Sequence, residues 1–167
     1  NVTTAELNDL FRWCSDIGMY ATDRAINNTA NHEGSCDHRT DYCDETCYNV
    51  KLYKIYPNMA NRDDRCETIW AKLNRHNSNF TKFFSRKRKQ TSRVRHMTRG
   101  EAFKTSIDVY RVKTMCLLNP DQLWWIPTRA WRNPRLKALI EKEVMPLDNC
   151  AVNASFDPSN TDEEWKM

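Results

Sequence analysis

Apolar residues recur at intervals of three and four along most of the chain, which is the period of helices that bury one face. Near the start, Thr3-Thr4-Ala5-Glu6 has the form of a capping box, so we expect the first helix to run from there to about Ile26. Further helices are predicted over residues 41–56, 61–84, 98–116 and 133–146. Asn133 and Pro134 give the last of these an N-cap and a proline in its first turn.

The succession of these helices predicts a mainly α fold, a single disulfide-stapled helical bundle of four to five helices with irregular loops. Only three glycines occur in the chain, and this favours helices over a sheet with tight turns. Residues 124–127, Trp-Trp-Ile-Pro, are expected to form an irregular connection. We expect a helical, disulfide-stabilised domain over residues 1–150. Residues 151–167 would be an acidic C-terminal tail or the start of a truncated segment.

Charge is spread unevenly along the sequence. Residues 68–100 carry ten basic side chains and no acidic one, whereas residues 1–67 carry seven basic and twelve acidic groups. The formal net charge of +4 therefore hides a strongly polarised molecule. A block of this kind indicates a polyanion, a protease or an acidic protein surface as its partner.

The densest part of the basic block is a run of four cations, which three arginines extend as far as residue 99. Four consecutive cations cannot share one face of a helix, so this segment is predicted to encircle a helix or to line an exposed loop. Two alternatives stay open: a solvated loop that only keeps the protein soluble, and a dibasic processing site at Lys87-Arg88. The predicted binding residues of this segment, 86–99, are Arg86, Lys87, Arg88, Lys89, Arg93, Arg95 and Arg99.

Cysteine usage and glycosylation motifs indicate the compartment. Seven cysteines are more than a cytosolic protein of 167 residues usually has, and four Asn-x-Ser/Thr sites accompany them. The sites are Asn1, Asn27, Asn79 and Asn153. The chain begins without an initiating Met, as a mature product of signal-peptide removal would, and it has no run of eighteen apolar residues. We therefore expect a secreted or extracellular surface location and no transmembrane segment within this chain.

The cysteines are expected to form about three disulfides that link helix to helix, with connectivity left open. Because their number is odd, one of them is predicted to be free or to bond a partner chain. A rival interpretation takes Cys36, His38, Cys43 and Cys47 as a zinc site, although their spacing differs from that of structural zinc sites. The full set of expected disulfide cysteines is Cys14, Cys36, Cys43, Cys47, Cys66, Cys116 and Cys150.

A second candidate binding patch lies near residue 130, where tryptophans alternate with arginines. Tryptophan and arginine are enriched at interface hot spots, so Trp131 and Arg132 are predicted to contact a partner protein. The alternative is that these tryptophans pack in the core of the bundle.

No motif of a known enzyme class occurs: Gly-x-Ser-x-Gly, His-Glu-x-x-His, a phosphate-binding glycine loop and a dinucleotide fingerprint are all missing from the sequence. We expect no catalytic residue, cofactor or metal. The predicted function is a secreted or ectodomain glycoprotein that binds a cell-surface receptor, with segment 86–99 contacting sulfated glycosaminoglycan or another acidic surface. Nucleic acid fits the charge but is disfavoured for a secreted chain. The alternative is a small secreted hydrolase that uses His38 with a nearby carboxylate.

Overall fold

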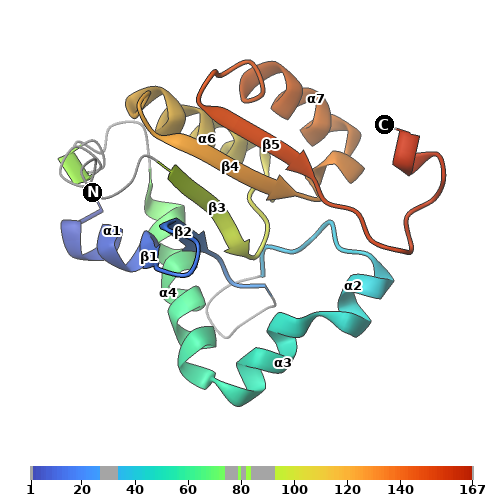
Figure 1. Cartoon of the computed structure of the whole chain (residues 1–167), viewed down its shortest axis with the longest axis horizontal. Helices are drawn as coiled ribbons and strands as arrows, with labels where there is room; N and C mark the ends of the chain where they lie inside the picture. Colours follow the sequence, from blue (N-terminus) through green and yellow to red (C-terminus); the bar gives the residue numbers. More distant parts are fainter. Residues whose placement is uncertain (1, 27–33, 74–78, 80–81, 84–92, 167) are drawn as a thin grey trace.

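The computed structural model describes residues 2–26, 34–73, 79, 82–83 and 93–166. Within these residues the chain forms an α/β fold around a five-stranded mixed sheet (Figure 1). The prediction of a mainly α helical bundle is therefore wrong. The three-and-four spacing of apolar residues was taken as helical over residues 12–23, which form β-strands. Residues 93–99, which were taken as part of an exposed basic connection, form a strand as well.

The strands follow the chain in spatial order β1-β2-β3-β4-β5. The first two form an antiparallel hairpin, and the pairs β2–β3, β3–β4 and β4–β5 are parallel. Their bounds are β1 (Arg12–Cys14), β2 (Met19–Asp23), β3 (Arg93–Arg99), β4 (Leu123–Thr128) and β5 (Cys150–Ala154). The sheet thus continues past residue 150, where the sequence led us to expect the end of the folded domain.

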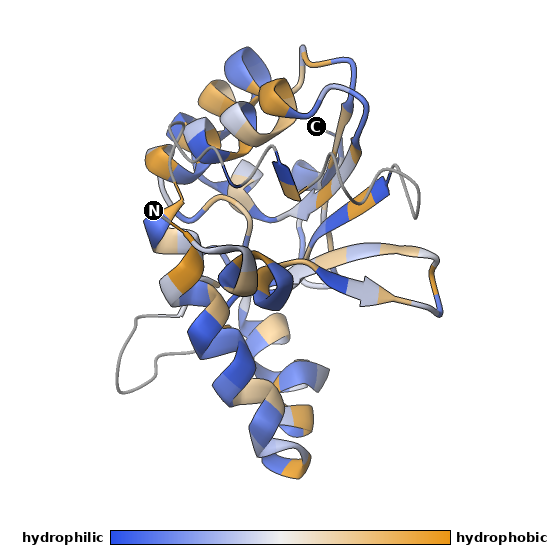
Figure 2. Cartoon of the chain, turned by 90° about the vertical axis from the view of Figure 1, so that its left-hand side faces the viewer, coloured by the Kyte–Doolittle hydropathy of each residue, from blue (hydrophilic) through white to orange (hydrophobic). Residues whose placement is uncertain are grey.

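Helices α4 (Pro57–Lys72), α6 (Ser106–Leu118) and α7 (Pro134–Glu143) lie in the connections between the parallel strands. In the view of Figure 1, α6 and α7 lie behind the sheet (Figures 1 and 2). Two short helices, α2 (Asp41–Thr46) and α3 (Tyr48–Ile55), lie beyond the carboxyl end of β3. The remaining described elements are α1 (Thr4–Leu10) and the 3-10 turns η1 (Ala130–Arg132) and η2 (Glu164–Lys166). No described helix is both long and apolar enough to cross a membrane.

The core lies between the sheet and the helices behind it. Val94 and Trp124 are register neighbours on β3 and β4, and both are buried. Val112 of α6 and Ile140 of α7 belong to the same apolar cluster. The residues next to Val94 and Trp124 on β3 and β4 point to the opposite side of the sheet, which α6 and α7 do not cover.

The alternation of β3 and β4 was present in the sequence. In β3, Arg93 and Arg95 are less buried than Val94 and His96, and in β4 exposed Leu123 and Trp125 alternate with buried residues. Arginines on one face of β3 made the segment look like a solvated loop. Pro127 made β4 look irregular, but it lies beyond Trp125, the last residue of β4 that pairs with β3, so the missing N–H costs no hydrogen bond to that strand.

The end of β3 departs from regular strand geometry. Met97 has a positive φ of 61°, and the register with β2 shifts there, since Ala21 faces Arg95 and Asp23 faces Arg99. The hydroxyl of Thr22 accepts a hydrogen bond from the Met97 N–H at 2.8 Å. Gly100 follows with φ 78°, and a Cβ there would lie 2.6 Å from the Ser35 hydroxyl. The chain therefore needs glycine to leave the strand at this point.

Several predicted helix ends are confirmed and others are wrong. The Thr3 capping box and the Asn133 cap of α7 are both present. The box predicted at residues 98–101 is not formed; Thr105 and Asp108 cap α6 instead. The first helix ends at Leu10, and the helix predicted over 41–56 breaks at Cys47 into α2 and α3.

The expected disulfides are absent, because all seven cysteines are free thiols in the structure. Sequence spacing placed them on helices of a bundle that does not exist. Cys116 and Cys150 are hydrogen-bonded neighbours, and this contact together with burial raises the pKa of Cys116. Burial also raises the pKa of Cys36 and of Cys66 to about 12, so both are protonated at neutral pH.

Candidate functional site

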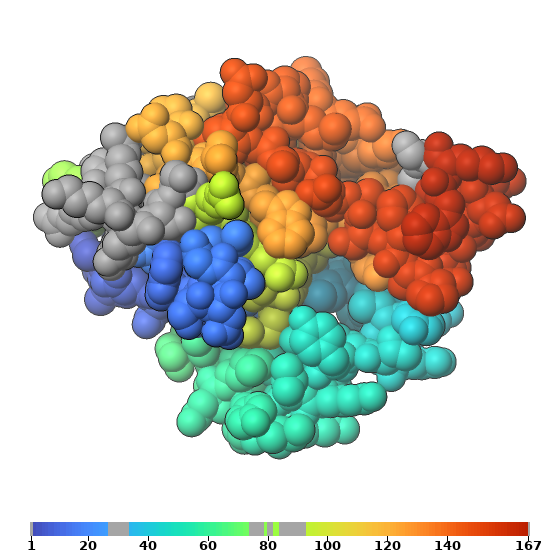
Figure 3. Space-filling model, in the orientation of Figure 1, coloured from blue at the N-terminus to red at the C-terminus, as the bar shows by residue number. Residues whose placement is uncertain are grey.

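A cleft of about 340 Å³ opens at the carboxyl ends of β3, β4 and β5. We call it the strand-end cleft. Its walls come from α2 and α3 on one side and from residues 155–157 on the other, and Figure 3 shows a hollow between these segments. In open parallel sheets, ligands bind in crevices outside the carboxyl ends of the strands. The position of this cleft makes it the first candidate for a binding site.

Most arginines that line the cleft are paired with carboxylates. Arg39 forms an ion pair with Asp44, and Nη1 of Arg129 lies 2.8 Å from Oδ2 of Asp157. Arg99 is paired with two carboxylates, Asp23 and Asp63. Charge already matched within the protein attracts an external anion less strongly.

The guanidinium of Arg99 is bound by two carboxylates with no exposed surface. Its Nε and Nη2 donate to Asp63 at 2.5 and 2.7 Å, and Nη2 lies 3.0 Å from Asp23. Desolvation lowers the pKa of Arg99, but the hydrogen bonds and charges of these carboxylates outweigh it and raise the pKa above its usual value. The hydroxyl of Tyr53 on α3 donates to Asp63 at 2.6 Å and fastens α3 to the cluster. Arg99 is therefore an integral part of the fold.

Arg95 differs from these arginines. Its Cζ lies 4.8 Å from the centroid of the Trp125 ring, and its buried Nε has no hydrogen-bond partner. Among the described residues, no carboxylate forms an ion pair with it. Trp125 is its register neighbour on β4 and is 41% exposed. The pair therefore presents an uncompensated positive charge beside an accessible aromatic surface.

Arg95 and Trp125 belong to a larger surface, which we call the Arg95 face: Arg93, Arg95, Leu123 and Trp125. Arg93 is the register neighbour of Leu123, as Arg95 is of Trp125, so all four side chains project from the same side of the sheet. This side is opposite to the one that packs on α6 and α7. Pro127 continues the same row of β4 into the strand-end cleft.

Two carboxylates of the cleft are fully occupied by internal hydrogen bonds. Glu101 accepts from the Thr128 hydroxyl at 2.5 Å and from the Phe103 and Arg129 N–H groups at 3.1 and 2.8 Å. Desolvation would raise the pKa of Asp157, but hydrogen bonds from Ser159 and Thr40 lower it to about 2. These groups fix the loops that follow β3, β4 and β5.

The residues proposed for hydrolysis do not form a catalytic pair. His38 lines the strand-end cleft, but its buried Nε2 has no hydrogen-bond partner, and no described carboxylate bonds its ring. The zinc interpretation receives no support either, because no group of three or more His, Cys, Asp or Glu among the described residues is placed to hold a metal ion.

The second predicted patch is placed elsewhere, at η1. Trp131 is only 8% exposed; its indole N–H donates to the Ser155 carbonyl, and its ring lies 4.7 Å from that of Phe156. Phe156 in turn stacks on Trp165. Arg132 donates to the carbonyls of His38 and Arg39. These contacts fasten the C-terminal segment and the loop before α2, and His38, Arg39 and Ser155 line the strand-end cleft.

The other predicted residues are distributed as follows. Arg86, Lys87, Arg88, Lys89, Asn1 and Asn27 lie outside the described residues. Asn79 donates from its amide to the Val2 carbonyl at 3.1 Å, so a glycan there would have to replace this hydrogen bond. Asn153 lies on β5 and is exposed beside Pro127 of β4.

A buried ionic cluster behind the sheet went unnoticed in the sequence. Arg24 donates to Glu67 and lies 3.2 Å from Asp108, which also accepts from the Trp70 indole at 2.8 Å. Desolvation opposes ionisation of Asp108, but Arg24 and the Trp70 hydrogen bond lower its pKa. His96 lies between the rings of Trp70 and Trp124. No sequence spacing links these residues; only the arginine directly after β2 hints at a partner.

Comparisons with protein-family models, with curated proteins and with solved structures found no match to this chain. The interpretation of the site therefore rests on its own geometry.

Proposed function

We propose that this protein is an extracellular binding protein that holds an acidic partner on the Arg95 face, with a sulfated glycosaminoglycan as the favoured class. The observation that carries the proposal is Arg95: it is stacked on Trp125 and has no carboxylate partner among the described residues. A sulfate group would supply the counter-charge that no described carboxylate provides. Charge-assisted hydrogen bonds of this kind are about twice as strong as neutral ones.

The shape of the Arg95 face supports a chain-like polyanion. Arg93 and Arg95 are two residues apart on one strand, so their Cα atoms are separated by roughly 7 Å along β3. Trp125 and Leu123 provide apolar surface between and beside the cations. A sugar chain can place its anionic groups on the arginines and its C–H faces on the indole. In the sequence, the cations at 86–89 lie shortly before this strand, separated from it by residues 90–92.

The cellular setting of the proposal rests on the sequence. The four glycosylation motifs favour a secreted or surface location, where sulfated sugars are available. A receptor protein with an acidic surface is the second partner that this face would accept, and the basic segment would speed its approach. We also propose that one of the free thiols could form a disulfide with a partner chain.

The test is retention of the glycosylated protein on immobilised heparin, read as the salt concentration at elution. Arg95→Gln is expected to elute earlier and to weaken affinity about fivefold, which corresponds to about 1 kcal/mol. Arg135→Gln is the matched control, because Arg135 is exposed on α7 and its removal changes net charge equally.

Equal elution of the two variants would show that heparin responds to net charge alone, and this would overturn the proposed site. Failure of the unsubstituted protein to bind heparin at low salt would overturn the glycosaminoglycan assignment. Binding to cells that resists both high salt and heparin competition would favour the receptor.

A further inference from the structure

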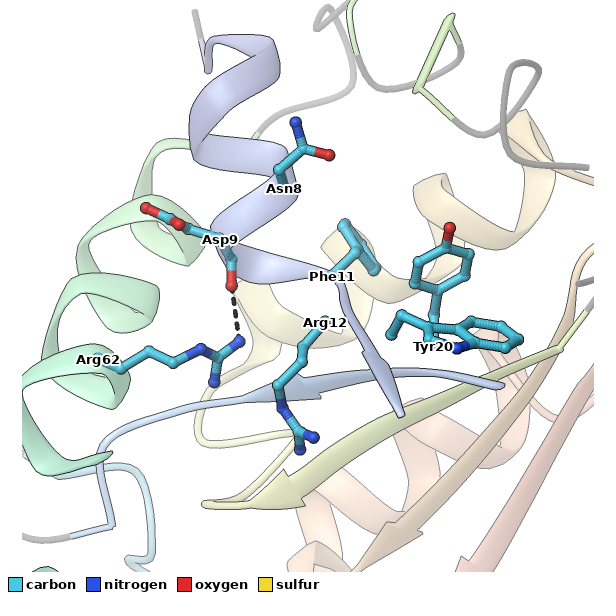
Figure 4. A pocket seen from close by; sticks show the side chains of 7 residues that line it. Asn8, Asp9, Phe11, Arg12, Tyr20 and Arg62 are labelled. Carbon is cyan, nitrogen blue, oxygen red and sulfur yellow. Dashed lines mark hydrogen bonds between the residues drawn. The ribbon is translucent and has the colours of Figure 1, made fainter. Parts of the chain in front are cut away.

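The two edges of the sheet are protected to different degrees. At one edge, β1 has only three residues and carries the charged side chain of Arg12. Figure 4 shows Arg12 beside Arg62 of α4 and Asp9 of α1, and Arg62 donates to the Asp9 carbonyl at 2.6 Å. A short, charged strand flanked by helices is a poor template for pairing with another strand.

The strand at the other edge, β5, has none of these features. It pairs with β4 and with no other strand among the described residues, and Cys150–Ala154 include no charged residue and no proline. The strand does contain Asn153, which begins the motif Asn153-Ala154-Ser155, an acceptor for an N-linked glycan. A bulky, hydrophilic glycan on β5 would hinder pairing of this edge with another chain.

The register of β5 determines the side of the sheet on which Asn153 lies. Asn153 is the register neighbour of Pro127, and Ala151 is that of Trp125. Register neighbours point to the same side of a sheet, and so do residues two apart on one strand. The residue between Ala151 and Asn153 packs on the core instead. Asn153 therefore projects from the side of the sheet that carries the Arg95 face.

The indole of Trp125 is contacted on one side and open on the other. Arg95 approaches it from β3, with its Cζ 4.8 Å from the ring centroid. Toward β5, the register neighbour of Trp125 is Ala151, whose methyl group is too small to cover an indole. Asn153 is one strand and two residues away from Trp125, which separates their Cα atoms by roughly 8 Å. A glycan on Asn153 would therefore start close to the open side of this ring.

Asn153 is also the described acceptor asparagine that the fold leaves free. Its side chain is exposed, and no described residue forms a hydrogen bond with its amide. Asn79, by contrast, donates from its amide to the Val2 carbonyl at 3.1 Å. Attachment of a sugar to Asn153 therefore disturbs no contact of the described structure.

We propose that Asn153 carries an N-linked glycan whose first sugars lie against the open side of Trp125, so that glycosylation regulates access to the Arg95 face. The bond forms between Nδ2 of Asn153 and the anomeric carbon of a sugar, which leaves its lipid diphosphate carrier while the amide loses a proton. The C–H groups of the sugar pack on the indole, which is the surface that a sulfated chain would use. The regulatory effect rests on the function proposed above, whereas the position of the glycan does not.

The test compares the protein with Asn153→Gln, both made in cells that add only neutral glycans, so that glycan charge plays no part. Mass spectrometry measures the occupancy of Asn153. Heparin is expected to bind Asn153→Gln about two- to tenfold more tightly, the range expected for one aromatic stacking contact. Ser155→Ala removes the same motif and should give the same result. Asn1→Gln, which removes the motif at the start of the chain, is the matched control and should leave the affinity unchanged.

An unmodified Asn153, or equal heparin affinity of the protein and Asn153→Gln, overturns the proposal. If neither form binds heparin, the function proposed above fails, and acrylamide quenching of Trp fluorescence then tests the position of the glycan by itself. The glycosylated protein should be quenched less than Asn153→Gln, and this difference should vanish when Trp125→Phe is introduced into both. Equal quenching of the two forms contradicts a glycan that lies on Trp125.

Discussion

Arg95 and Arg99 lie four residues apart on the same strand and meet opposite surroundings. Arg99 is bound by Asp63 and Asp23, both fully shielded from solvent, and it ties the end of β3 to α4. Arg95 lies over the Trp125 ring and has no carboxylate partner among the described residues. Arg99 is therefore neutralised by carboxylates of the fold, whereas Arg95 is available to a ligand.

The comparison shows that a count of basic residues overstates the charge that a partner can reach. Arg99 and Arg129 line the strand-end cleft with Arg95, yet carboxylates from elsewhere in the chain already balance them. A buried ion pair contributes little net stability compared with an apolar pair, but removing one member is costly. Substitution of Arg99 or its carboxylate partners should therefore change stability, whereas substitution of Arg95 should change ligand binding.

The largest effect is expected from the carboxylate that Arg99 needs. Asp63→Asn would leave the guanidinium of Arg99 without its main acceptor and remove the partner of the Tyr53 hydroxyl. Unfolding free energy should fall by about 3–5 kcal/mol, as it does when one member of a buried ion pair is lost. Urea denaturation measures this. Asp148→Asn, at an exposed position, is the control and should change stability by less than about 0.5 kcal/mol. Equal, small effects would contradict the structural role given to Arg99.

A smaller effect is expected from His96, which lies on β3 between the two arginines and points into the core. Desolvation, with the charge of Arg24, lowers the pKa of His96 to about 3. Because the unfolded histidine has a pKa near 6.5, only the unfolded state takes up a proton as pH falls from 6.5 toward 3. Stability is therefore highest above pH 6.5 and should drop by about 2 kcal/mol between pH 7 and pH 5.

The urea midpoint at pH 7, 6 and 5 measures this effect. Carboxyl groups with a lowered pKa, such as Glu6, Asp108 and Asp157, lose their contribution to stability mainly below about pH 4.5, so most of the change between pH 7 and pH 5 comes from the histidine. His96→Gln should flatten the dependence. A midpoint that stays constant over this range in the unsubstituted protein would show that His96 is not shielded as the structure has it.

The sequence allowed part of this picture to be predicted. The helix starts at Thr3 and at Asn133-Pro134 were visible, because caps are local and depend on a few adjacent residues. The strands were missed because a row of arginines on one face of β3 resembles a loop, and because the bulge at Met97 places two buried residues in succession.

The candidate site was predicted only in outline. Arg93, Arg95 and Arg99 were predicted as binding residues of one basic segment, but their different surroundings could not be read from the sequence. Asp63 and Asp23 are 36 and 76 residues away from Arg99 along the chain. The parallel pairing of β2 with β3 brings Asp23 to Arg99, and α4 carries Asp63.

The most direct test measures heparin elution and urea stability together for Arg95→Gln and Arg99→Gln. We predict that Arg95→Gln elutes at lower salt with stability changed by less than about 0.5 kcal/mol. We predict that Arg99→Gln loses about 3–5 kcal/mol of stability, while its folded fraction elutes later than Arg95→Gln and close to the unsubstituted protein. If both variants elute equally early, or if Arg95→Gln is the less stable of the two, the division of roles between these arginines is contradicted.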